Sequence, residues 1–186
     1  MIAQQLLQCG LLQLGLFDEN GSKAPYRLKL ELLPAYPHLF AKIVDDLTSR
    51  LRDIQTQPDR LVAGADAVAL AGAVSLRCNI SLVYSRGRGE PPVHDLAGAY
   101  NFGHPSSLIV NTIQPGLSDF IAGCGRVGLD IQTVIPVIDT SPELLPSGVQ
   151  ILPLISLSEV IRDLESDHAI PVSQVQTMRS YLTAAN

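Results

Sequence analysis

The chain has 186 residues and carries 13 lysines and arginines against 18 acidic residues, a formal net charge of −5 at pH 7. This balance argues against a generic nucleic-acid binder, because a phosphate backbone is bound by clustered basic side chains that this sequence lacks. A chain of this length fits one domain that buries roughly 70% of its unfolded surface, so no disulfide or structural metal is needed for stability.

The cysteines Cys9, Cys78 and Cys124 lie far apart in the sequence and form no C-x-x-C pair. This spacing is typical of free thiols in a reducing compartment, and buried apolar packing is their simplest role. The N-terminus has no basic n-region, and no apolar run approaches the roughly 18 residues that span a bilayer. We therefore expect a cytoplasmic protein without a membrane segment.

Apolar periodicity predicts helices that alternate with strands over most of the chain. The predicted helices are residues 2–14, 38–54, 67–77, 120–129, 156–165 and 173–182. The predicted strands are residues 26–32, 60–63, 81–85, 108–111 and 132–138, with a loop at residues 17–26. Asp66 is expected to cap the third helix, and Ser156 with Glu159 to form a capping box ahead of the fifth. This alternation predicts an α/β fold, a doubly wound and mainly parallel sheet of about five strands.

The segment from residue 107 to residue 119 carries the first functional signal. An apolar run ends at Asn111 and Thr112, a turn with Gln114 and Gly116 follows, and helical spacing resumes near Ser118. Backbone N–H groups at such a helix start are unpaired, so this place in α/β proteins often holds a ligand phosphate. The alternative is a strand end whose polar side chains are only solvated.

A second signal is the long polar stretch at residues 86–105, which exceeds the usual length of a connection in a compact domain. It contains Arg86, Arg88 and His94. Such a stretch is usually a lid, a hairpin or a mobile insert. Its basic side chains are either solvated or form an anion-binding loop that is contributed to a neighbouring subunit.

Short segments in a fixed order carry a family pattern, namely residues 20–26, 36–37, 62–64, 83–86, 107–119 and 155–159. Together they resemble the orotate phosphoribosyltransferases of the type I phosphoribosyltransferase family. The resemblance covers nearly the whole chain and implies a single domain over residues 1–186. It implies a core at residues 37–149, a small hood from residues 1–36 and 150–186, a flexible loop at residues 86–105, and a homodimer.

The resemblance also implies an enzyme that holds Mg²⁺-bound phosphoribosyl diphosphate and transfers its phosphoribosyl group to orotate. The implied catalytic residues are those of the loop: Arg86, Arg88 and His94. The implied phosphate and ribose contacts are Asn111, Thr112, Gln114, Gly116 and Ser118. The implied contacts to the diphosphate and the base are Lys23, Tyr26, Gly64 and Asp66.

The sequence departs from the family where the chemistry is expected. Asn111 and Thr112 stand where the family has two adjacent acidic residues, so neither brings a charge to a Mg²⁺-linked ribose. In the phosphate turn Pro115 has no N–H and Leu117 replaces a small residue. Asp66 adds a negative charge beside the expected diphosphate, and repulsion there weakens binding of the substrate.

Two functions follow from this mixture of likeness and loss. The first is a catalytically degenerate homologue that needs no metal and uses the pocket to bind a nucleotide or another small anion, or serves as a dimeric interaction module. The second is an active phosphoribosyltransferase that makes orotidine monophosphate and needs Mg²⁺. A third reading, an unrelated α/β protein, would be established by the lack of a hood. No nucleic-acid or membrane partner is expected, and the sequence has no metal-ligand spacing of its own.

Overall fold

The computed structural model describes residues 2–19, 22–88, 92–140 and 145–185. The chain divides into two compact units. One consists of residues 1–39 and 155–186, and the other of residues 40–154. No helix within the described ranges has the length and apolar character needed to cross a bilayer.

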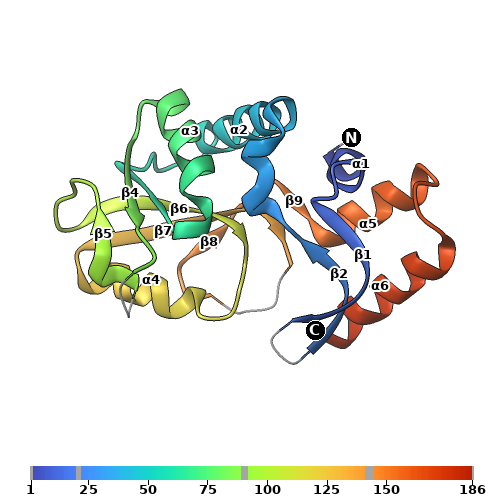
Figure 1. Ribbon diagram of the computed structural model, residues 1–186. Helices are drawn as coiled ribbons and strands as arrows, with labels where there is room; N and C mark the ends of the chain where they lie inside the picture. The colour runs from blue at the N-terminus through green and yellow to red at the C-terminus, as the bar shows by residue number, and fades with distance from the viewer. Residues whose placement is uncertain (1, 20–21, 89–91, 141–144, 186) are drawn as a thin grey trace. The chain divides into compact units, whose positions relative to one another are not determined.

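The unit at residues 40–154 is built on one twisted sheet, with strand order β5-β4-β3-β6-β7-β8 (Figure 1). The strands are β3 (Arg60–Ala63), β4 (Ser81–Ser85), β5 (Leu96–Ala97), β6 (His104–Thr112), β7 (Leu129–Asp139) and β8 (Gln150–Ile151). Strands β4, β3, β6, β7 and β8 run parallel, and β5 pairs antiparallel with β4. The predicted α/β fold with a mainly parallel sheet is confirmed.

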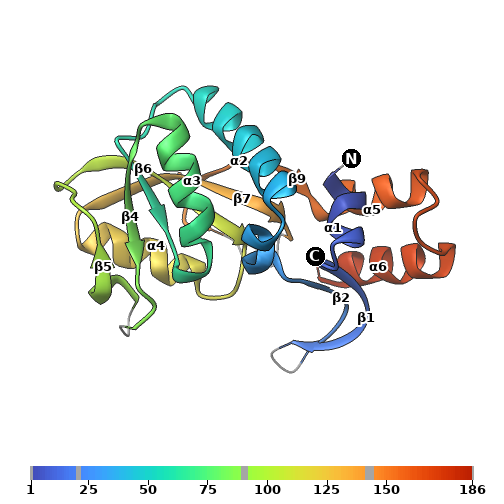
Figure 2. The same cartoon turned by 45° about the horizontal axis from the view of Figure 1, so that its top comes forward.

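Helices cover both faces of this sheet, as Figures 1 and 2 show. The helices are α2 (Pro37–Arg52), α3 (Val68–Cys78) and α4 (Leu117–Arg126). Helices α2 and α3 lie on one face and α4 on the other. A core of buried Val, Leu and Ile side chains, with Cys124 among them, fills the space between the sheet and α4. Strands buried on both faces read as continuous apolar runs, which is why β3 and β6 were predictable.

The second unit joins the two ends of the chain. Its elements are α1 (Ile2–Gln8), β1 (Leu12–Glu19), β2 (Ser22–Leu28), a 3₁₀ helix η1 (Leu30–Ala35), β9 (Ile155–Ser156), α5 (Leu157–Ser166) and α6 (Val172–Ala185). Strands β1 and β2 form an antiparallel hairpin. Tyr26 of β2 packs edge-on against Tyr181 of α6, with ring centroids 6.0 Å apart.

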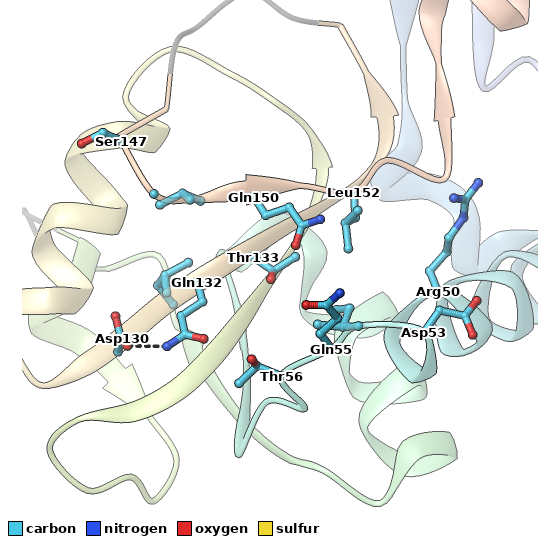
Figure 3. A pocket seen from close by; sticks show the side chains of 14 residues that line it. Arg50, Asp53, Gln55, Thr56, Asp130, Gln132, Thr133, Ser147, Gln150 and Leu152 are labelled. Carbon is cyan, nitrogen blue, oxygen red and sulfur yellow. Dashed lines mark hydrogen bonds between the residues drawn. The ribbon is translucent and has the colours of Figure 1, made fainter.

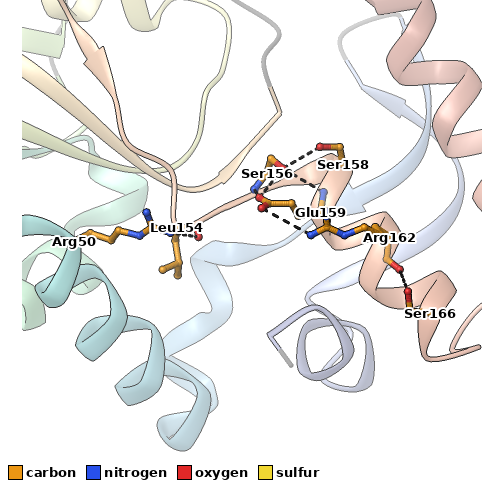
Figure 4. Close-up of polar contacts among 7 residues, drawn as sticks. All are labelled: Arg50, Leu154, Ser156, Ser158, Glu159, Arg162 and Ser166. Carbon is orange, nitrogen blue, oxygen red and sulfur yellow. Dashed lines mark hydrogen bonds and ion pairs between the residues drawn. The ribbon is translucent and has the colours of Figure 1, made fainter. Parts of the chain in front are cut away.

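The predicted capping box at the start of α5 is confirmed (Figure 4). The backbone N–H of Glu159 donates to Ser156 Oγ at 3.2 Å, and the backbone N–H of Ser156 donates to Glu159 Oε2 at 2.8 Å. Two donors that the first helical turn leaves unpaired are thereby satisfied.

The N-terminal prediction was wrong in part. The first helix ends at Gln8 rather than at residue 14, and Gly10 follows with φ of +69°, a conformation that favours glycine. Residues 12–19 form β1, and the strand expected at residues 26–32 is instead β2 followed by η1. The Leu-Gln-Leu-Gly-Leu run of β1 alternates at period two, but its leucines also continue the helical stripe, so the sequence alone fits both a strand and a helix.

Three further features differ from the prediction: a helix cap, the bounds of α4 and the structure of residues 86–105. Asp66 does not cap α3, because it lies inside the 3₁₀ turn η2 (Ala65–Ala67) and the N-cap residue is Ala67. Helix α4 begins three residues earlier than expected, at Leu117, and ends at Arg126. The long stretch at residues 86–105 contains a 3₁₀ helix, η3 (Pro92–Asp95), and strand β5, so it is partly structured.

Candidate functional site

The strand order places a switch point between β3 and β6. From β3 the chain crosses through α3 to β4 on one side, whereas from β6 it crosses through α4 to β7 on the other. In open α/β sheets the carboxyl ends of two such strands leave a crevice, and ligands bind there. The loops that follow β3 and β6 are therefore where a site is expected.

A pocket of about 270 Å³ occupies this crevice. The loop after β3 contributes Gly64, Ala65 and Asp66, and the end of β4 contributes Ser85 and Gly87. From β6, the turn after it and the start of α4 come Leu108, Val110, Thr112, Gln114, Pro115, Gly116, Leu117 and Phe120. The structure thus brings together five predicted site residues: Gly64, Asp66, Thr112, Gln114 and Gly116.

Asn111, near the end of β6, is hydrogen-bonded to the loop that follows β3. Its side chain is 5% exposed, and its Nδ2 donates to the backbone oxygen of Asp66 at 3.0 Å and to Asp66 Oδ2 at 3.3 Å. The amide is therefore used to fix η2 against the end of β6. A carboxylate at this position has no proton to donate, so the contact depends on asparagine.

The turn after β6 is shaped by Gly116, which has φ of +88° and is the N-cap of α4 without a side-chain capping bond. The N–H of Leu117 donates to Gln114 O at 3.2 Å, and the N–H of Phe120 donates to Gly116 O at 3.1 Å. Pro115 has no N–H. Two backbone positions of the expected phosphate turn, Pro115 and Leu117, therefore offer no free donor to a ligand.

Arg86 and Arg88 line a neighbouring cavity of about 490 Å³ together with Ala65, Tyr84 and Ser85. Both arginines are exposed. The two cavities share Ala65 and Ser85 as lining residues. The arginines are thus near the loop after β3 but are absent from the described lining of the smaller pocket.

Hydrogen bonds among Ser85, Gly87, Arg88 and Asp95 form a clasp that holds the chain as it leaves β4. Ser85 Oγ donates to Asp95 Oδ1 at 2.8 Å, and the N–H of Arg88 donates to Asp95 Oδ2 at 2.6 Å. The N–H of Gly87 donates to Ser85 Oγ at 3.1 Å. Gly87 has φ of +73°, and a Cβ there would lie 2.9 Å from Ala65 Cβ, so this close approach requires glycine.

The remaining predicted residues are dispersed. His94 is exposed on η3, and Ser118 lies in the first turn of α4 outside the described lining of the pocket. Lys23 is exposed on β2, and Tyr26 packs on Tyr181, both in the unit that joins the chain ends. The sequence did not reveal Asp95 or Phe120. The helical spacing around Phe120 was a usable signal for the apolar wall, but the partnership of Asp95 with Ser85 had none.

A larger cavity, of about 890 Å³, lies elsewhere in the same unit (Figure 3). It is lined by the end of α2, the start of β7 and β8, and its polar side chains are Arg50, Asp53, Gln55, Thr56, Asp130, Gln132, Thr133, Ser147 and Gln150. Gln132 Nε2 donates to Asp130 Oδ2 at 2.8 Å, and both side chains are exposed. None of the predicted site residues is in its described lining.

No protein-family model and no curated protein sequence matches the chain. Solved structures do match it. The UMP synthase of Leishmania donovani superposes with a TM-score of 0.83 at 20% identity, over 98% of this chain and 42% of that one. This chain therefore spans less than half the length of that protein.

Two orotate phosphoribosyltransferases match over most of both chains. The Francisella tularensis structure gives a TM-score of 0.75 at 15% identity, with 99% of this chain and 95% of that chain covered. The Aeropyrum pernix structure gives 0.74 at 18% identity, with 89% and 99% covered. The chain has the fold of the type I phosphoribosyltransferases. The family resemblance seen in the sequence is confirmed at the level of the fold, and identities this low carry no activity with them.

Type I phosphoribosyltransferases work with Mg²⁺, so we tested whether the residues of this pocket fit that ion. Mg²⁺ prefers carboxylates together with substrate phosphates. Within the described lining, Asp66 is the one carboxylate, and it already accepts a hydrogen bond from Asn111. Asn111 and Thr112 supply no charge at the end of β6. The donor set does not fit a Mg²⁺-linked ribose.

Proposed function

We propose that this protein is a catalytically degenerate phosphoribosyltransferase-like protein that uses the crevice between β3 and β6 to bind a nucleotide or another small ligand. One observation carries the proposal. Asn111 stands where the orotate phosphoribosyltransferases that this chain resembles have an acidic residue, and its Nδ2 donates to the backbone oxygen and the carboxylate of Asp66. A neutral amide does not provide the charge that a Mg²⁺-linked ribose requires.

The groups around the pocket also support the proposal that catalysis is lost. The backbone N–H of Leu117 is bonded within the turn, and Pro115 has no N–H. In addition, the Asp66 carboxylate lines the pocket and would repel a departing diphosphate. Stabilisation of developing negative charge is usually the largest contribution to catalysis of such a group transfer, and this pocket opposes it.

The test is formation of orotidine monophosphate from orotate, phosphoribosyl diphosphate and Mg²⁺. We expect no product from the wild-type protein above the level given by an Arg86→Ala variant. Product that requires Mg²⁺ and disappears in Arg86→Ala would overturn the proposal.

The second candidate is an active phosphoribosyltransferase, and one observation favours it. Arg86 and Arg88 line a cavity beside the loop after β3, where cations could neutralise a leaving diphosphate. This candidate predicts that phosphoribosyl diphosphate raises the melting temperature only when Mg²⁺ is present. Ligand at 100 times its dissociation constant stabilises by about 2.7 kcal/mol, which for a chain of this size is roughly 5 to 10 °C.

We further propose a cytoplasmic homodimer. The free thiols of Cys9, Cys78 and Cys124 are compatible with a reducing compartment, and the family resemblance implies a two-fold assembly. Sedimentation equilibrium of the purified protein tests the assembly. A monomer at micromolar concentration would refute it.

A further inference from the structure

The pocket between β3 and β6 has a mainly apolar wall. Its apolar side chains come from β6, from the turn and from α4: Leu108, Val110, Pro115, Leu117 and Phe120. Leu108 and Val110 belong to the buried core, with 0% and 6% exposure. Because that core is packed, the shape of the wall is fixed rather than adaptable.

The size of the pocket limits its occupant. Sites for drug-sized ligands usually measure about 300 to 1,000 Å³. At about 270 Å³, this pocket has room for a single ring system. A flat ring also suits a wall that contains the Phe120 ring, since aromatic rings stack or meet edge to face.

The charge of the pocket favours a hydrogen-bond donor. Asp66 is the one ionisable side chain in its described lining, which contains no Lys, Arg or His. The carboxylate accepts one bond from Asn111 Nδ2, and an ionised carboxylate has about four lone-pair sites. Asp66 therefore retains acceptor capacity for the N–H group of a ligand.

The same groups disfavour a phosphate. A phosphate brings negative charge toward the Asp66 carboxylate, and like charges in one site repel. It also needs donors, and two positions of the turn cannot supply them, because the N–H of Leu117 donates to Gln114 O and Pro115 has no N–H. The guanidinium groups of Arg86 and Arg88 line the neighbouring cavity instead.

We infer that this pocket binds a flat heteroaromatic ring without a phosphate, oriented so that an exocyclic amino group donates to Asp66 and the ring lies against Phe120. The inference rests on the proposed binding role and narrows its ligand to the class of amino-substituted nucleobases. Thr112, Ser85 and Gln114 line the pocket with further polar groups that can bond the edge of such a ring.

The experiment is isothermal titration calorimetry with matched pairs of probes. Adenine is compared with hypoxanthine and cytosine with uracil, since each pair differs by an amino group exchanged for an oxo group. Ribose 5-phosphate and inorganic phosphate are run beside them. A hydrogen bond to a charged group favours the amino-bearing base, but Asp66 is exposed and water competes for it, so we expect this base to bind about threefold to tenfold more tightly. The two phosphates should show no binding at this pocket.

Variants locate the site. Asp66→Asn should remove the preference for the amino-bearing base, and Phe120→Ala should weaken all four bases about tenfold. Asp119→Asn is the matched control, because Asp119 is an exposed carboxylate of α4 outside the described lining of the pocket, and it should change nothing. Melting temperatures establish that each variant is folded. The titrations on the wild-type protein decide the selectivity even if a variant does not fold.

Each result has a distinct meaning. Equal affinities for amino and oxo bases, or a preference that survives Asp66→Asn, would overturn the inference. Binding of ribose 5-phosphate without the bases would overturn it as well but would leave a binding role intact. Mg²⁺-dependent formation of orotidine monophosphate would instead remove the proposed function itself.

Discussion

Two cavities of the unit at residues 40–154 differ in chemistry as well as in size. The larger one, about 890 Å³, is lined by glutamine, threonine, aspartate and arginine side chains at the start of β7 and the end of α2. The smaller one, about 270 Å³, lies at the carboxyl ends of β3 and β6 and combines a core-anchored apolar wall with one carboxylate.

Volume alone therefore does not decide which of the two cavities binds a ligand. Asp130 and Gln132 in the larger cavity are exposed, so water competes for their hydrogen bond. Asp66 in the smaller pocket is exposed as well, but the wall beside it is anchored by Leu108 and Val110, which are 0% and 6% exposed. Discrimination between ligands depends on such dry, fixed groups.

The largest effect is expected for Asn111→Asp. The change removes the donor to Asp66 and places a second carboxylate within hydrogen-bond distance of it. The lost hydrogen bond to the Asp66 backbone oxygen and the burial of a carboxylate at position 111, which is 5% exposed, together should lower the free energy of unfolding by about 2 to 4 kcal/mol at pH 7. Repulsion by Asp66 adds less, because Asp66 is exposed and water screens its charge. Urea denaturation measures this loss.

A double variant that exchanges Asn111 and Asp66 is the control for this prediction. In the double variant Asn111→Asp with Asp66→Asn, the new asparagine can donate to the new aspartate, so the side-chain part of the loss should be recovered, whereas the bond to the backbone oxygen of residue 66 stays lost. If the double variant is as unstable as the sum of the two single variants, the two side chains do not interact. Recovery in the double variant would show that the two side chains interact. An attempt to restore activity by replacing Asn111 and Thr112 with aspartate would then also require removal of Asp66.

The contact between Asn111 and Asp66 also marks how far the sequence could predict the site. The apolar runs of β3 and β6 identified two buried strands, and parallel strands bring their carboxyl ends to one edge, so both residues could be expected there. The direction of the Asn111 amide could not be predicted. It depends on η2, which forms where the sequence favoured Asp66 as a helix cap.

In the fold as well, features encoded by local sequence patterns could be predicted, and features that depend on pairing between separate segments could not. The stripe of α2 and the capping box of α5 are local patterns, and both were predicted correctly. The β1–β2 hairpin was missed because its leucines fit a helix and a strand equally well until the two strands pair. The clasp of Ser85 by Asp95 depends on a pairing of side chains ten residues apart, which no periodicity encodes.

The next effect concerns Cys124, which lies on α4 in the core behind the smaller pocket. Burial raises the pKa of this thiol from 9.0 to about 12. Above pH 9.0 the thiol ionises in the unfolded chain but stays neutral in the folded protein, so its stabilising contribution is complete below pH 9.0 and is lost as pH rises toward 12. At about 1.4 kcal/mol per pH unit, the free energy of unfolding should fall by about 2 kcal/mol between pH 9 and 10.5.

Cys124→Ala removes this titration and serves as the reference. Urea denaturation of both proteins at pH 8, 9 and 10.5 should show the steeper decline only in the wild type, since every other titrating group is shared. Parallel pH profiles would contradict the assignment. A thiol reagent applied to the native protein should also spare buried Cys124 while it modifies the half-buried Cys9 and Cys78.

A smaller effect is expected for Asp95→Ala at the edge of the pocket. The change removes the acceptor for Ser85 Oγ and for the N–H of Arg88. We expect a loss of about 1 kcal/mol in unfolding free energy. Hydrogen exchange at the amide of Arg88 should become faster, because this amide loses its partner. Asp95→Asn keeps one acceptor oxygen and should fall between the wild type and Asp95→Ala. Unchanged exchange in Asp95→Ala would show that the clasp does not hold the chain after β4.

The smallest effect is expected in the larger cavity, for Gln132→Glu. This change repeats the chemistry of Asn111→Asp, since it converts an amide that donates to a carboxylate at 2.8 Å into a second carboxylate. Asp130 and Gln132 are exposed, however, so water screens the repulsion and replaces the lost hydrogen bond. The free energy of unfolding should change by less than about 0.5 kcal/mol, and 1 M salt should abolish the remainder. If Gln132→Glu instead costs as much as Asn111→Asp, the larger cavity is as rigid and dry as the smaller one, and the contrast between them is lost.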